Sequence, residues 1–137
     1  LQDYPEKDAK AAIQLQQIFY RMTKYFIENF NTANFLTEAL YHSKAASYFT
    51  NYRVQHFIFV RTLIEQAQRE GDICSDMNSY EIYTTLQSIL TQPIIIKNNI
   101  LQQHKNEPLM DKLKLIDVSS GSSLQKRLRV AFKGLRP

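Results

Sequence analysis

A long amphipathic segment that ends at a glycine places the strongest constraint on this chain. Within residues 48–73, one set of apolar side chains has the three-and-four spacing of a helix face: Phe49, Tyr52, Val60, Leu63, Ile64 and Ala67. A second set widens that stripe: Val54, Phe57 and Ile58. Gly71 predicts the end of the helix, because glycine adopts a left-handed turn without steric cost, and Ile73 is expected to fold back onto the last turn. The pattern predicts a long central helix covered on more than one side.

Composition favours one all-α domain over residues 1–137. Apolar residues make up 44% of the 137 residues, enough for a core, and only three glycines and four prolines argue against a turn-rich sandwich or barrel. No apolar run approaches the roughly 20 residues that span a membrane, and no signal peptide is visible. The single cysteine, Cys74, is compatible with a cytoplasmic protein. The chain starts at Leu1 without a methionine, so we expect a part of the protein to precede it.

Two helices are expected before the central one, and a third begins directly after it. Residues 8–30 carry an apolar stripe at helical spacing, and Thr32 or Asn34 is suited to cap a shorter helix that runs to about Lys44. Ser47 is a candidate cap for the central helix. Asn78 followed by Glu81 has the spacing of a capping box and predicts the start of the next helix.

The C-terminal third is expected to be less regular. Pro93 lies inside the helix that follows Asn78 and predicts a kink or a break there. Residues 106–123 contain Pro108 and the SSGSS run and are expected to be irregular. Residues 122–135 form a last amphipathic helix with a basic outer side. Its apolar face must dock on something, because alone it would face water.

The sequence contains no constellation that predicts an enzyme, a metal site or a cofactor. There is no glycine-rich phosphate loop, no HExxH and no CxxC. His42, His56 and His104 are far apart in sequence, and Cys74 has no basic neighbour that would lower its pKa. The net charge of +4 is modest for a dedicated nucleic-acid binder. The function is therefore expected to be binding rather than catalysis.

Two short segments resemble the TetR family of transcriptional regulators. The passage EQAQREGDI, then Asp76 and a new helix from about Asn78, is similar to the connection between the seventh and eighth helices of that family. The ending VAFKGLRP is similar to the end of many members. The all-helical layout agrees with the family's C-terminal domain over nearly the whole chain.

The resemblance implies a ligand-sensing and dimerisation domain of a cytoplasmic regulator. In that family a small, often apolar effector binds this domain, and operator DNA is bound by an N-terminal helix-turn-helix domain, which is missing from this chain. By itself the chain is therefore expected to bind DNA only weakly. The alternative is a helical protein–protein interaction module unrelated to transcription. A third and weaker interpretation is a lipid-carrier or enzyme-like bundle.

The resemblance and the last amphipathic helix together predict a symmetric homodimer. The family pairs its last two long helices across the dimer, which correspond to about residues 78–103 and 122–135 here. The apolar face of the last helix has more surface than a short helix needs internally, and two-fold interfaces are self-complementary. The residues expected at this interface are Leu86, Leu90, Leu124, Leu128, Phe132 and Leu135.

The aromatic side chains predict an apolar pocket between the first helix and the central helix. Eight tyrosines and eight phenylalanines are present, most of them before Val60. Aromatic walls with a few polar groups are typical of small-molecule sites. The candidate ligand-binding residues are Phe19, Met22, Phe26, Tyr52, His56 and Phe59. The competing interpretation is that these six side chains fill the core.

Overall fold

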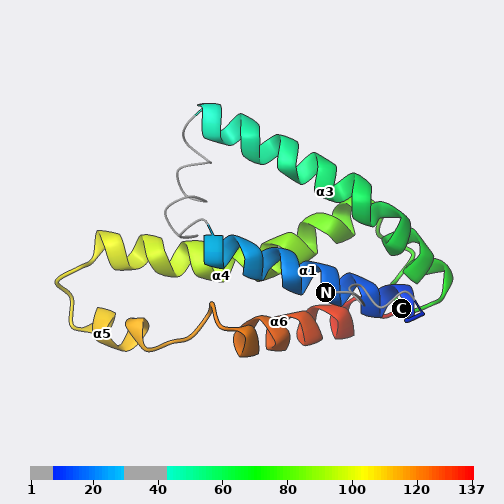
Figure 1. Cartoon of the computed structure of the whole chain (residues 1–137). Helices are drawn as coiled ribbons and strands as arrows, with labels where there is room; N and C mark the ends of the chain where they lie inside the picture. The colour runs from blue at the N-terminus through cyan, green and yellow to red at the C-terminus, as the bar shows by residue number, and fades with distance from the viewer. Residues whose placement is uncertain (1–7, 30–42) are drawn as a thin grey trace.

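The computed structural model describes residues 8–29 and 43–137 and is helical throughout (Figure 1). Within these ranges there is no β-strand, which confirms the predicted all-α class. The helices are α1 (Ala11–Asn29), α3 (Ser43–Arg69), α4 (Ser79–Gln103), α5 (Leu109–Lys114) and α6 (Gly121–Gly134).

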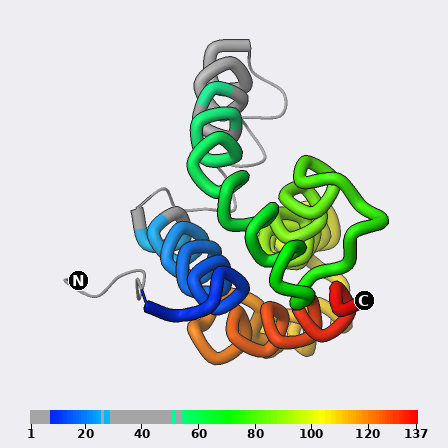
Figure 2. Tube along the Cα trace, turned by 90° about the vertical axis from the view of Figure 1, so that its right-hand side faces the viewer, coloured from blue at the N-terminus to red at the C-terminus, as the bar shows by residue number. Residues whose placement is uncertain are grey.

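Helices α1, α4 and α6 pack against one another, and α3 adds a fourth side to the bundle (Figure 2). The core between them is built from one apolar stripe of each helix, with Leu15, Ile64, Leu86 and Leu124 all fully buried. Burying a side chain of this size contributes about 1.5–3 kcal/mol, so the four stripes together supply the driving force for the bundle. The core is completed by Ile73, which follows the end of α3.

Helix α3 is longer than predicted, and its second apolar set is largely exposed. It begins at Ser43, so Ser47 lies inside the helix and does not cap it. Its C-terminal half buries Val60 and Ile64, whereas Val54 and Ile58 are 47% and 60% exposed. Of the second apolar set only Phe57 is partly buried against the core, so the expected cover on more than one side is met only in part. The physical reason is visible in Figure 1, where α3 diverges from the rest of the bundle towards its N-terminal end.

The end of α3 follows the prediction made from Gly71. Gly71 has φ +81°, in the left-handed region. The backbone N–H of Asp72 donates to the carbonyl of Ala67 at 3.0 Å, which closes the last turn. Ile73 then folds back and is fully buried. The stop turns the chain so that α4 can pack against α3.

Local signals also account for the start of α4. The Glu81 N–H donates to Asn78 Oδ1 at 2.9 Å, and the Asn78 N–H donates to Glu81 Oε1 at 3.2 Å, which confirms the capping box. Pro93 does not break the helix, which is continuous from Ser79 to Gln103. A proline removes one backbone hydrogen bond. The buried residues that precede and follow Pro93 in the sequence hold the other backbone hydrogen bonds of the helix in register.

The C-terminal part is more regular than expected. Residues 109–114 form the short helix α5, and α6 begins at Gly121 after a side-chain cap from Ser120. The first helix agrees with the prediction apart from a start three residues later, at Ala11. The short helix expected from Thr32 or Asn34 falls on residues 30–42, which lie outside the described part of the chain.

We expect Gly71→Ala to lower the free energy of unfolding by about 1–2 kcal/mol, because a Cβ is strained at positive φ. The effect is a backbone effect alone, since a Cβ at this position would meet no atom within 4 Å. Gly134→Ala is the matched control, because that position is equally open and is not at positive φ. Urea denaturation of both variants measures the difference, and equal stabilities would contradict this account of the stop.

Candidate functional site

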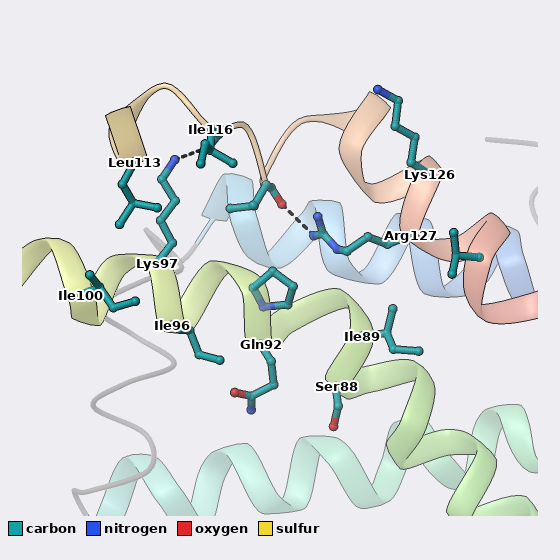
Figure 3. A pocket seen from close by; sticks show the side chains of 13 residues that line it. Ser88, Ile89, Gln92, Ile96, Lys97, Ile100, Leu113, Ile116, Lys126 and Arg127 are labelled. Atoms are coloured by element: carbon teal, nitrogen blue, oxygen red, sulfur yellow. Dashed lines mark hydrogen bonds between the residues drawn. The ribbon is translucent and has the colours of Figure 1, made fainter. Parts of the chain in front are cut away.

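An apolar groove runs along the outer side of α4, away from the core (Figure 3). Its other walls are α5, the residues that follow it, and α6. The groove has a volume of about 760 Å³. The lining residues are Ser88, Ile89, Gln92, Pro93, Ile96, Lys97, Ile100, Leu113, Ile116, Val118, Lys126, Arg127 and Val130.

The floor of the groove is a second apolar stripe on α4. Ile89, Pro93, Ile96 and Ile100 follow one another at spacings of four, three and four residues, so they share a helix face. Ile96 is 51% exposed, and Val130 of α6, on the opposite wall, is 70% exposed. An exposed apolar surface spanning two helices marks a binding site more often than a surface of scattered apolar residues does.

Two cationic side chains hold the far wall in place. We call residues 115–120, between α5 and α6, the connecting segment. The Lys97 ammonium donates to the carbonyl of Ile116. The Arg127 guanidinium donates to the carbonyl of Val118 at 2.7 Å and to that of Leu90, in α4, at 3.0 Å. Bonds from a charged donor are stronger than neutral ones, so these side chains attach the segment firmly to α4 and α6.

Burial and a neighbouring carboxylate act in opposite directions on the pKa of Arg127. Desolvation lowers the pKa of its guanidinium, and the carboxylate of Asp117 in the connecting segment opposes this effect. Asp117 is itself held by hydrogen bonds from Ser120 and from the N–H of Ser119, which lower the pKa of its carboxyl. Asp117 thus favours the charged form of Arg127, whose guanidinium lies in an otherwise apolar wall.

The structure describes the side chains of four of the six residues predicted to form a ligand pocket between α1 and α3. Phe19 and His56 are both buried and in contact, with ring centroids 5.3 Å apart. Met22 is partly buried against the same core. Phe59 is 63% exposed, unlike Phe19 and His56, and its place in that pocket stays a prediction. The buried stripe of α3 passes through His56 and Val60, which turns Phe59 towards solvent. The side chains of Phe26 and Tyr52 lie outside the description.

His56 belongs to a buried polar cluster that the sequence reasoning missed. Its Nδ1 lies 3.1 Å from the Tyr83 hydroxyl and 3.1 Å from Nε2 of Gln87. The Gln87 amide also donates to the Tyr83 hydroxyl at 3.1 Å. Tyr83 and Gln87 are four residues apart on α4. This spacing in the sequence indicates that their side chains share a helix face. Burial lowers the pKa of His56 from 6.5 to about 4, so the imidazole is neutral at physiological pH.

The six residues expected at a dimer interface lie inside the bundle of a single chain. Leu86, Leu90, Leu124, Leu128, Phe132 and Leu135 are all between 0 and 7% exposed. Helix α6 docks its apolar face on α1 and α4 of its own chain. The surplus apolar surface that motivated this interface is therefore already covered. The exposed apolar stripe of α4 lies on the opposite face, where the sequence reasoning did not place it.

The described residues contain no group of three or more histidine, cysteine, aspartate or glutamate side chains that could hold a metal ion. No helix within those residues is long and apolar enough to cross a membrane. Comparison with protein-family models, with curated proteins and with solved structures finds no match to this chain. The groove and the polar cluster are therefore interpreted from their own geometry.

We expect the free energy of unfolding to fall as the pH is lowered from about 6.5 to about 4. The unfolded chain protonates His56 near its ordinary pKa of 6.5, and the folded chain only near 4, so the unfolded state gains the proton first. The full effect is on the order of 3 kcal/mol. The stabilising contribution is present above pH 6.5 and is lost across this interval.

His56→Gln removes the titrating group and keeps a hydrogen-bonding side chain, so its unfolding free energy should depend less on pH between 6.5 and 4 than that of the natural protein. His104→Gln is the control, because His104 is exposed on the surface near the end of α4. Chemical denaturation at several pH values measures both. Identical pH dependence in all three proteins would show that His56 is not the group responsible.

Proposed function

We propose that this chain is the effector-sensing domain of a TetR-like transcriptional regulator and that the groove beside α4 binds a small, largely apolar effector. The observation that carries the proposal is the groove itself. Ligand sites in proteins have volumes of roughly 300–1,000 Å³ and are lined by apolar side chains with a few polar groups. A volume of about 760 Å³ and a lining dominated by isoleucine, leucine, valine and proline fit that description.

The position of the groove suits a sensing role. It lies between α4, α6 and the connecting segment, so a ligand there would touch several elements of the fold at once. A ligand that binds one arrangement of these elements better than another shifts the population towards that arrangement. Binding of operator DNA would rest with an N-terminal helix-turn-helix domain, as the resemblance to the TetR family implies.

A symmetric homodimer is a second proposal, and it uses the outer faces of α4 and α6. The supporting observation is the exposure of Ile96 and Val130 on the two helices expected to pair. A second copy packed on these residues would cover the groove. Effector and second copy would therefore exclude one another on this face, which links effector binding to assembly.

Fluorescence titration with Nile red, a neutral apolar dye, tests the effector site. We expect saturable binding, and we expect Ile96→Gln to weaken it about tenfold, because the variant replaces apolar surface in the groove by a polar amide. Ile58→Gln on α3 is the matched control, since Ile58 is similarly exposed outside the groove. Absent or non-saturable binding would count against the proposal and would favour a protein–protein interaction module unrelated to transcription.

Sedimentation equilibrium tests the homodimer. We expect Val130→Lys to shift the chain towards monomer, because it adds a further cation to a face where Lys97, Lys126 and Arg127 of the two copies would already meet. Ile58→Lys introduces the same charge at a similarly exposed position on α3 and should leave the assembly unchanged. The dimer proposal fails if the natural chain is monomeric at all concentrations, or if both variants behave alike.

A further inference from the structure

The charged groups that line the groove are all cations. Lys97 comes from α4, and Lys126 and Arg127 come from α6. No aspartate or glutamate is among the lining residues. The acid that acts electrostatically on Arg127 is Asp117, outside the lining. Its carboxylate is exposed and accepts hydrogen bonds from the N–H groups of Ser119 and Ser120. An apolar groove with an excess of positive charge is complementary to a ligand that is apolar along its length and negative at one end.

Arg127 has a donor group that its protein contacts leave unused. Its Nη1 donates to Ser123 Oγ at 2.8 Å, and its Nη2 donates to two backbone carbonyls. Its Nε–H is buried and has no hydrogen-bond partner among the described residues. This Nε–H is closed off from the groove, so Arg127 acts on a ligand through its positive charge rather than through a free donor. Lys126, next to it in sequence, is exposed and free to turn towards the same ligand group.

We propose that the effector is a single-chain carboxylic acid, whose alkyl chain lies along Ile89, Pro93, Ile96 and Ile100 and whose carboxylate is held by Lys126 and Arg127. This inference rests on the proposed function, in which the groove is the effector site. The apolar stripe runs from Ile89 to Ile100, about 16 Å along the axis of α4, which accommodates an extended medium-length alkyl chain. A carboxylate accepts charge-assisted hydrogen bonds, which are roughly twice as strong as neutral ones.

The same charges make a second copy the less suitable occupant of the groove. A two-fold interface is self-complementary, so each cation of one copy would face the corresponding surface of the other. Lys97, Lys126 and Arg127 would then be brought together without an acid in the lining to compensate them. A carboxylate ligand has the opposite sign and reduces the repulsion.

Isothermal titration with decanoate and decanol tests the inference on the whole chain. The two probes have the same alkyl chain and differ in charge at one end. We expect decanoate, kept below the concentration at which it forms micelles, to bind about tenfold more tightly than decanol, which corresponds to one charge-assisted bond. Higher salt should reduce this preference, because salt screens the interaction between exposed charges.

Lys126→Gln should reduce the preference for decanoate about threefold and leave decanol affinity unchanged, since Lys126 is exposed and contributes charge rather than apolar surface. Lys133→Gln removes the same charge from an exposed position of α6 outside the groove and should change neither affinity. If the two variants reduce decanoate binding equally, the attraction is a general effect of net charge, and the inference is overturned.

The remaining outcomes separate this inference from the proposed function. Equal binding of decanol and decanoate would overturn the carboxylate assignment and leave the groove as a site for neutral apolar ligands. Failure of both probes would contradict the proposed function as well. If neither probe binds and the chain sediments as a dimer that Val130→Lys dissociates, the groove belongs to a second copy.

Discussion

The structure depends on how α6 covers its apolar face. An isolated helix of 14 residues is only marginally stable in water, so α6 needs a packing partner to form at all. It finds this partner in α1 and α4 of the same chain, where Leu124 and Leu128 are almost completely buried. Any contact with another molecule must therefore use a different face. On α4 and α6 the exposed apolar surface that both helices share is the one that forms the groove.

The shape of the groove depends in turn on two cationic side chains that bind backbone carbonyls. Lys97 and Arg127 attach the connecting segment to α4 and α6 through the carbonyls of Ile116 and Val118. Without these bonds the segment would have few contacts to hold it, since Leu115 and Ile116 are largely exposed. The same residues thus form a wall of the groove and supply its positive charge. This double role connects the fold to the proposed binding chemistry.

Local rules in the sequence predicted the helix boundaries better than the surfaces. Gly71 and the Asn78–Glu81 pair act within a few residues of the chain, so their effects could be predicted without knowledge of the tertiary fold. The orientation of α4 could not be predicted in this way. It carries two apolar stripes, one through Leu86 and one through Ile96, and only packing against the other helices decides which is buried. The same reason explains why Phe59 was assigned to a pocket although it faces solvent.

The most direct test of the account is to locate a bound apolar molecule by nuclear magnetic resonance of isoleucine methyl groups. Titration with decanol should shift the methyl signals of Ile96, Ile100 and Ile116, which line the groove. The signals of Ile58 on α3 and Ile18 in the core should stay in place. Shifts confined to Ile18 and its neighbours would instead place the ligand between α1 and α3 and contradict the assignment of the groove as the binding site.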